Sequence, residues 1–360
     1  MSRLNRTLAA GAALLAVALG TSACVGPPAS HWAKQNNLDC PFEPDESVTT
    51  HVTLAYQMIP NGDRIVQNQR MLETCMPNAS IDWKRFESAG DILQAYGAGS
   101  IDYGLLGSAG LARGLSKPLS QDLVTPWVFD EIGTAESLVV KDDAITDIRG
   151  LKGKTIAVTY SSTSHYSLLG ALDQAGMKAG TDVKLVNLSP DRMLAGWQSD
   201  QIDAAFVWDP TLSELMESGH VITSAKEAAE GGAPTYDMAT FTRSFVEKNP
   251  EFMEVWAKAQ DAAIRQIQED PDTAAGSIAA VLGLETDTVL QQLKGYAYPR
   301  ATEQASGEML GGDLGMLLYD TAKFLKDNQE VDAVDDPEVY QRALYKNAAQ
   351  AAADMTGDQS

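Results

Sequence analysis

The chain has 360 residues and a formal net charge of −22 at pH 7, with 49 acidic against 27 basic side chains. This acidity excludes nucleic acid as a partner, because nucleic-acid binding requires a positively charged surface. Any anion that binds here must be held by local donors, such as helix N-termini and hydroxyl groups, rather than by a basic field. A chain of this length exceeds what one hydrophobic core usually supports, so the sequence predicts two domains.

The N-terminus has the layout of a secretory signal peptide. Arg3 and Arg6 precede a run over residues 8–19 that contains only leucine, alanine, valine and glycine. A positive segment, a short apolar run and small residues, in this order, direct export and are then removed. The run is too short to cross a bilayer as a mature helix, and a short buried helix is the alternative. We therefore predict a signal peptide over residues 1–23.

The three cysteines have separate predicted roles. The small residues directly before Cys24 resemble a bacterial lipobox, and this resemblance implies a lipid on Cys24 after cleavage. Residues 24–47 are then a lipidated tether, which holds the protein in the periplasm or on the outer face of the cytoplasmic membrane. Cys40 and Cys75 remain as an even pair in an oxidising compartment, which predicts a disulfide. Two free buried thiols are the alternative.

Short apolar runs alternate with helical stretches along the next part of the chain. The pattern predicts three strands and two helices, with strands at 52–56, 81–86 and 103–106 and helices at 63–73 and 92–97. This βαβαβ order implies a largely parallel sheet with its ligand chemistry at the carboxyl ends of the strands.

The same order starts again after residue 140. Strands are predicted at 155–158, 183–186 and 204–207, and helices at 165–175 and 192–198. Four further helices are predicted at 244–268, 271–282, 285–294 and 312–328. Because these helices follow two complete α/β units, they suggest that the chain returns to the first unit.

We therefore predict an α/β protein of two lobes with a ligand cleft between them. Lobe 1 comprises residues 48–140 and 237–360, and lobe 2 is an insertion of residues 141–236. The hinge lies near residues 136–140, where the chain first crosses between the lobes.

The loop over residues 160–166 carries the strongest candidate site. It follows a predicted strand, opens a helix and contains four consecutive hydroxyl side chains. Free backbone N–H groups, the helix dipole and hydroxyls converge at such a point, which suits a sulfonate, carboxylate or phosphate. We predict Ser162, Thr163 and His165 as ligand-binding residues, and ordinary helix capping is the alternative for the hydroxyl residues.

Further candidates lie at strand ends and at the crossovers. Ser108 lies in a loop of small residues, where the backbone can approach a ligand closely. Trp208 ends a predicted strand and can pack on a ligand or on the core, and Asp209 after it can face the ligand or cap a helix. Glu136 and Asp237 fall in the two predicted crossovers, where a carboxylate can accept hydrogen bonds from a ligand ammonium or remain a surface charge.

The sequence carries no pattern for catalysis or metal binding. The four histidines have no metal-ligand spacing, and neither a GxSxG nor a Walker A pattern occurs. We therefore predict no catalytic residue, no metal site and no cofactor.

Several stretches of the chain resemble the periplasmic taurine-binding proteins. Two of them are Ser162-Thr163-Ser164-His165-Tyr166-Ser167-Leu168-Leu169 and Gly232-Ala233-Pro234-Thr235-Tyr236-Asp237, and a shorter one is Ala55-Tyr56-Gln57. More broadly, the chain resembles the sulfonate and nitrate binders of the type II solute-binding fold. This resemblance implies two lobes that close on the ligand, with hydroxyls and backbone N–H groups on the sulfonate and acid groups on the ammonium. By position it adds Gln57 to the site. Gly231 and Ala239 depart from the taurine branch, which has tryptophan at both places.

The resemblance also implies the function. We expect a monomeric, extracytoplasmic lipoprotein that binds taurine or a related small sulfonate and delivers it to an ABC permease in the membrane. The alternatives are a binder of another small anion or zwitterion (alkanesulfonate, nitrate or a betaine-like molecule), a ligand sensor, and an enzyme built on the same fold.

Overall fold

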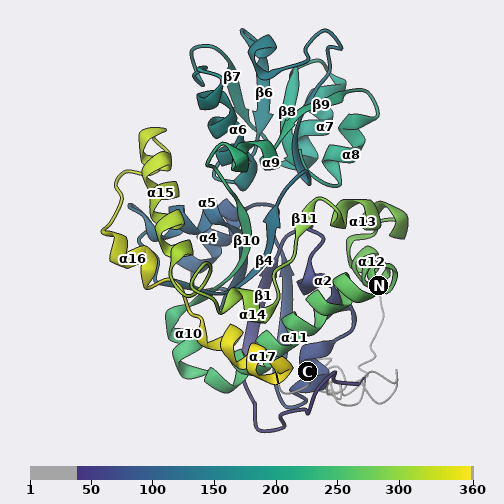
Figure 1. Cartoon of the computed structure of the whole chain (residues 1–360), viewed down its shortest axis with the longest axis vertical. Coiled ribbons are helices and arrows are strands. Elements are labelled where there is room, and N and C mark those ends of the chain that lie inside the picture. The colour runs from purple at the N-terminus through teal and green to yellow at the C-terminus, as the bar shows by residue number, and fades with distance from the viewer. Residues whose placement is uncertain (1–38, 358–360) are drawn as a thin grey trace, which may run out of the picture.

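The computed structural model describes residues 39–357, and its two β-sheets lie one above the other along the long axis of the molecule (Figure 1). The predicted signal peptide over residues 1–23 and the predicted lipid site at Cys24 lie outside the described residues. The predicted fold class, an α/β fold of two lobes, is confirmed by the two separate sheets with helices around each of them (Figure 1).

The first sheet has six strands in the order β11-β4-β10-β3-β1-β2. Their bounds are β1 (His51–Tyr56), β2 (Ser80–Arg85), β3 (Tyr103–Gly107), β4 (Leu123–Ile132), β10 (Tyr236–Thr242) and β11 (Tyr296–Ala297). Strands β1, β2 and β3 are parallel, as the βαβαβ pattern predicts, whereas β10 runs antiparallel to both β3 and β4. The sheet is therefore mixed rather than largely parallel.

The second sheet has five strands in the order β7-β6-β8-β5-β9. Their bounds are β5 (Glu136–Val140), β6 (Thr155–Val158), β7 (Lys184–Asn187), β8 (Ala204–Trp208) and β9 (His220–Ser224). The helices of this lobe are η1 (Ile148–Leu151), α6 (Thr163–Gln174), α7 (Pro190–Gln198), α8 (Thr211–Met216) and α9 (Ala225–Glu230). Strand β5 pairs antiparallel with β8 and β9, so it belongs to the interior of this sheet.

The chain crosses between the sheets twice, from β4 to β5 and from α9 to β10. The residues predicted as a hinge, 136–140, form strand β5 instead. All five side chains of this strand are buried, so both of its faces are covered, as in the interior of a sheet. We therefore propose that lobe 2 begins at Glu136 rather than at residue 141, with hinge segments at 133–135 and 231–235.

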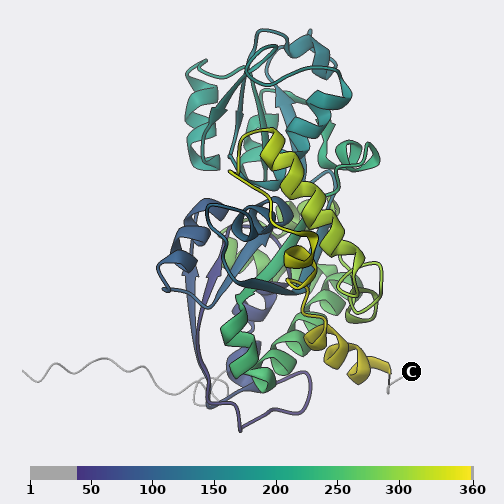
Figure 2. The same ribbon diagram turned by 90° about the vertical axis from the view of Figure 1, so that its left-hand side faces the viewer.

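The remaining helices surround the first sheet. They are α2 (Gly62–Asn68), α3 (Met71–Cys75), α4 (Ala89–Gly97), α5 (Ser108–Leu115), α10 (Arg243–Lys248), α11 (Pro250–Glu269), α12 (Pro271–Leu282), α13 (Thr286–Leu293), α14 (Ala301–Gln304), α15 (Asp313–Asp327), α16 (Pro337–Gln341) and α17 (Asn347–Gly357). Helix α15 runs up toward the second sheet (Figure 2), where the Phe324 ring packs edge-on against Tyr166 of α6, with 4.9 Å between centroids. The C-terminal part of the chain therefore touches both lobes.

Two predicted helices differ from the observed ones for local reasons, and a local reason also explains one strand that was missed. The helix predicted at 63–73 is two helices, because Arg70 has a left-handed conformation with φ of 53°. The helix predicted at 244–268 is also divided, since Pro250 has no N–H and begins α11. Strand β4 was not predicted, because Pro126 interrupts its apolar run. The sheet accommodates this proline where the pairing of β4 with β10 is irregular.

Cys40 and Cys75 form the predicted disulfide, with Cα atoms 5.0 Å apart and a sequence separation of 35 residues. The bond ties the beginning of the described chain to the end of α3. Among the helices of residues 39–357, none has the length and apolar character needed to cross a membrane.

Candidate functional site

Two helix N-termini, one from each lobe, meet at the centre of the molecule. Strand β3 ends at Gly107, which leads directly into α5, and Thr163 begins α6. A methyl group built on Gly107 would stand 2.4 Å from Cγ2 of Thr163, so only glycine allows the lobes to approach this closely. The first N–H groups of both helices have no acceptor within their own helix and carry the positive end of the dipole. This junction can therefore bind an anion.

Hydroxyl side chains surround this junction, and some of them have structural roles. Ser162 is the N-cap of α6, because its Oγ accepts the His165 N–H at 3.1 Å and donates to the Thr159 carbonyl at 2.6 Å. The Ser108 hydroxyl accepts the backbone N–H of Tyr236 at 3.3 Å. Ser164 is fully buried in the first turn of α6, and its hydroxyl has no hydrogen-bond partner among the described residues. It lies close enough to Glu136 to lower the pKa of that carboxyl, but the contact lacks hydrogen-bond geometry, so Ser164 is a further donor that the predicted residue set omitted.

Three carboxyl groups lie beside these hydroxyls. Glu136 opens β5 and accepts a hydrogen bond from the Thr163 hydroxyl, with Oγ1 and Oε1 2.5 Å apart. Asp237, near the start of β10, lies opposite Gly107 on β3 and opposite Asp130 on β4. All three carboxyl side chains are buried. The sequence predicted Glu136 and Asp237, and the structure brings them together beside the α6 N-terminus.

Burial and mutual repulsion favour the protonated forms of these groups. Burial, followed by the charge of Asp237, raises the pKa of Glu136 to about 8, and burial raises the pKa of Asp237 to about 7. Burial, and then the charges of Asp237 and Glu136, raise the pKa of Asp130 well above its usual range. A positive group placed among these carboxyls stabilises their ionised forms.

Two tyrosines of the β11 segment lie within electrostatic reach of the same carboxyls. Burial, and then the charge of Asp130, raise the pKa of Tyr296 and of Tyr298 well above the usual range. Both side chains are therefore neutral phenols at physiological pH, which can donate hydrogen bonds but cannot neutralise the carboxyls.

Trp208 is placed next to Glu136, whereas two other predicted residues have local structural partners. Trp208 lies directly opposite Glu136 in the β5–β8 pair, so both side chains point to the same face of the sheet. The Asp209 carboxylate accepts hydrogen bonds from the N–H and hydroxyl of Ser213, at 3.0 and 2.5 Å, and so satisfies an N–H group in the first turn of α8. The Gln57 amide donates to the Leu105 carbonyl at 3.1 Å, which fixes it beside β3.

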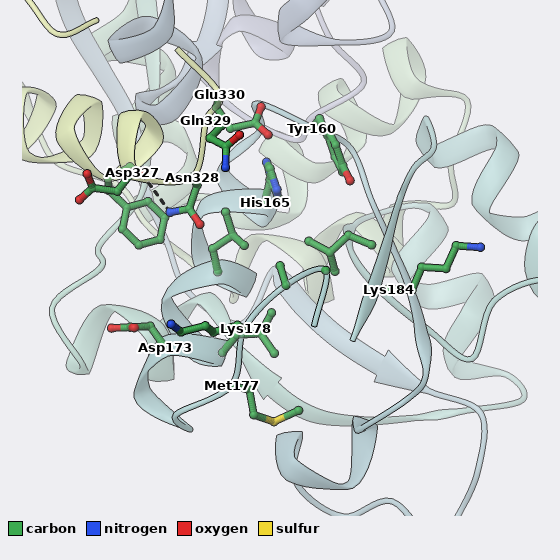
Figure 3. A pocket seen from close by; sticks show the side chains of 16 residues that line it. Tyr160, His165, Asp173, Met177, Lys178, Lys184, Asp327, Asn328, Gln329 and Glu330 are labelled. Carbon is green, nitrogen blue, oxygen red and sulfur yellow. Dashed lines mark hydrogen bonds between the residues drawn. The ribbon is translucent and has the colours of Figure 1, made fainter. Parts of the chain in front are cut away.

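His165 faces a different cavity from the carboxyl groups. It lines a pocket of about 760 Å³ between α6, β7 and the end of α15, together with Tyr160 and Glu330 (Figure 3). The Ser161 N–H donates to Nδ1 at 3.3 Å, and the Tyr160 ring stacks on the imidazole with centroids 4.6 Å apart. Burial lowers the pKa of His165 to about 4, so the ring is neutral at pH 7. The structure therefore does not bring His165 together with Glu136 and Asp237.

Asp130 was not found by sequence reasoning, although a signal exists. It follows the apolar run Val128-Phe129 inside a strand and is fully buried. A carboxylate inside an otherwise apolar strand is expensive to bury and is usually kept for a purpose. Within the described residues, no group of histidine, cysteine and acidic side chains has the arrangement of a metal site.

The two lobes meet over a buried site that offers helix N-termini to an anion and carboxyl groups to a cation. This arrangement defines the class of two-lobed solute-binding folds. The chain belongs to the family described as NMT1/THI5 like, which matches residues 81–274. It is 33% identical over 295 residues to the taurine-binding periplasmic protein of Escherichia coli (strain K12), a match that covers 80% of this chain and 90% of that protein. The predicted resemblance to the taurine and alkanesulfonate binders is thereby confirmed.

Solved structures of other proteins share the fold. The periplasmic aliphatic sulphonate binding protein SsuA from Escherichia coli superposes with a TM-score of 0.66 at 23% identity, covering 81% of this chain and 91% of that one. The desulfurization enzyme DSZB superposes with a TM-score of 0.60 at 15% identity, covering 85% of this chain and 99% of that one. The fold is therefore shared by a binding protein and an enzyme, and function must be argued from the site.

Proposed function

We propose that this protein is the extracytoplasmic solute-binding component of an ABC importer and that its ligand is taurine or a closely related small aminosulfonate. The observation that carries the proposal is the contact between an anion-binding junction and a group of buried carboxyls. A short zwitterion has its two charges separated by only a few bonds, so it can satisfy both at once. The taurine-binding relative supports the same ligand class.

The proposed binding mode assigns each end of the ligand to a part of the site. The sulfonate accepts hydrogen bonds from N–H groups of the first turns of α5 and α6 and from the Ser164 hydroxyl. The ammonium lies among the carboxyls, including Glu136 and Asp237. Because these groups come from both lobes, ligand binding favours the closed state, which the permease then recognises.

We further propose a binding role without turnover. Nδ1 of His165 accepts from the Ser161 backbone N–H, and no hydroxyl within residues 39–357 donates to this ring. The nucleophile–base pair that a Ser–His mechanism requires is therefore not formed around His165. Incubation of the purified protein with taurine should leave the ligand unchanged by mass spectrometry.

The ligand assignment is tested by calorimetry and thermal shift on the mature protein with taurine, hypotaurine, ethanesulfonate, nitrate, sulfate and glycine betaine. A ligand that binds only the folded protein raises the melting temperature by mass action. Taurine should give the largest shift. A response to nitrate or betaine without a response to any sulfonate would retain a binding protein and reject the sulfonate class.

The proposed role of Asp237 is tested by Asp237→Asn. This change should weaken taurine binding much more than ethanesulfonate binding, because only taurine has an ammonium group. Equal losses for both ligands would remove Asp237 from the ammonium role.

The proposed location is tested separately from ligand binding. Export with lipid attached to Cys24 should place the protein in the detergent phase of a phase-partition assay, and Cys24→Ala should move it to the aqueous phase. Size-exclusion chromatography with light scattering tests the proposed monomer.

A further inference from the structure

Asp130 is a buried carboxyl with no partner in the protein. It is fully buried on β4, and neither of its oxygens has a hydrogen-bond partner within the described part of the chain. The backbone amide of Asp237 lies close enough to lower the Asp130 pKa, but the contact lacks hydrogen-bond geometry. An isolated buried carboxylate is strongly unfavourable, so this side chain requires an explanation.

The protein treats its other fully buried aspartates differently. Asp63 lies 3.4 Å from the guanidinium of Arg64, and Asp261 lies 2.9 Å from that of Arg300. No ion pair formed within residues 39–357 involves Asp130. The fold therefore supplies cations to two of its buried aspartates and supplies none to the third.

The surroundings of Asp130 increase its need for a positive partner. Directly opposite residues of antiparallel strands point to the same face, so Asp130 lies beside Asp237. Glu136 is within electrostatic reach of both, and its Oε2 also lacks a partner. Tyr296 and Tyr298, which face the same group, are neutral and add no positive charge.

We propose that Asp130, together with Asp237 and Glu136, forms the subsite that binds a ligand ammonium group. Asp130 sets the preference of this subsite for aminosulfonates over sulfonates with an uncharged tail. The inference rests on the proposed function, because the adjoining α5–α6 junction fixes the sulfonate. An ammonium group brings both the missing charge and N–H donors for the free carboxylate oxygens. A hydroxyl group in the same position brings one donor and no charge.

The test compares taurine with 2-hydroxyethanesulfonate, which has a hydroxyl in place of the ammonium on the same carbon chain. Affinities of the wild type, Asp130→Asn and Glu131→Gln are measured by calorimetry at pH 8. Glu131 is the matched control, because it is the next residue of β4, is exposed and points to the opposite face. Both variants replace one carboxyl group by an amide, so a long-range charge effect on the bound taurine alone would appear in both.

The wild type should bind taurine at least roughly 100-fold more tightly than 2-hydroxyethanesulfonate, since hydrogen bonds to charged groups are stronger than neutral ones. Asp130→Asn should reduce that ratio by about tenfold or more, mainly through weaker taurine binding. Glu131→Gln should keep the ratio within about threefold. The unliganded Asp130→Asn protein should melt no lower than the wild type at pH 8, because the change replaces a buried carboxyl group that has no cation partner by a neutral amide of similar size. A structural role for Asp130 would instead lower its melting temperature.

Two outcomes overturn the inference, and they differ from failure of the proposed function. The ammonium subsite is rejected if Asp130→Asn leaves the ratio of taurine affinity to 2-hydroxyethanesulfonate affinity unchanged. It is also rejected if the wild type prefers taurine by less than about tenfold. In both cases sulfonate binding itself is retained. The wild-type ratio needs no variant, so it decides the matter even if Asp130→Asn does not fold. If the wild type binds neither sulfonate, the proposed function fails, and the inference fails with it.

Discussion

The contact between Gly107 and Thr163 predicts that a single methyl group prevents full closure of the lobes. In Gly107→Ala the new Cβ would stand 2.4 Å from Cγ2 of Thr163. Carbon atoms in contact are about 3.5–4.0 Å apart, so the lobes must separate by roughly 1 Å or more. Thr163 cannot easily turn aside, because it is β-branched and its hydroxyl is bonded to Glu136 at 2.5 Å. Overpacking of this kind costs about 1–3 kcal/mol, which corresponds to a roughly 5- to 150-fold loss of taurine affinity.

The companion change Thr163→Ser should restore binding in the double variant. Serine lacks Cγ2 but keeps the hydroxyl, and the next atoms of residue 163, Cβ and Oγ1, lie 3.5 Å from the added methyl group, an ordinary contact. Gly276→Ala is the control, because nothing lies within 4 Å of its added Cβ. Calorimetry with taurine on the two single variants, the double variant and the control measures the coupling energy. Wild-type affinity in Gly107→Ala, or single-variant losses that simply add in the double variant, would refute the role of this contact in closure.

Three further predictions concern charge, closure and stability. Taurine affinity should rise between pH 6 and 8, by up to about tenfold per pH unit for each proton that the ammonium ligand must displace, since the pKa values of Glu136 and Asp237 are about 8 and about 7. A flat calorimetric profile would contradict this. Phe324→Ala removes a ring that packs edge-on on α6, and this should weaken taurine binding about 2- to 12-fold without lowering the melting temperature of the free protein. Unchanged affinity would exclude α15 from closure. Reduction of Cys40–Cys75, which lie 35 residues apart, should destabilise the fold by about 3–4 kcal/mol in the chain-entropy model and leave taurine affinity unchanged. Denaturant unfolding with and without reductant measures this, and equal midpoints would contradict it.

Local pattern was enough to predict the elements that carry the anion end of the site. Short apolar runs predicted strands β1, β3, β6 and β8, because a continuous apolar run bounded by polar residues is a local property of sequence. The hydroxyl run after β6 predicted the α6 N-terminus, since capping chemistry depends on adjacent residues only. The even number of cysteines left after Cys24, together with the predicted export of the protein, predicted the disulfide. The strand and helix predictions succeeded because each depends on residues close to one another in the chain, and the disulfide prediction succeeded because only two cysteines remain once Cys24 is assigned to the lipid.

The assignment of individual side chains depended on tertiary structure. Asp130 and Asp237 are more than a hundred residues apart in the sequence and meet only because β10 returns to pair with β4. The closeness of Gly107 to Thr163 depends on how the two lobes meet. His165 turns toward the pocket beside α15 although it is only two residues from Thr163.

The sequence by itself therefore determined the two α/β units and the loops that can hold an anion, because those features follow from short apolar runs and local capping chemistry. The class of protein came from the resemblance of its motifs to the taurine-binding proteins. Only the tertiary structure decided which carboxyls share one buried space and which have a partner. A charge becomes costly when distant strands exclude water from it, and no pattern within a single strand records which strand will be its neighbour.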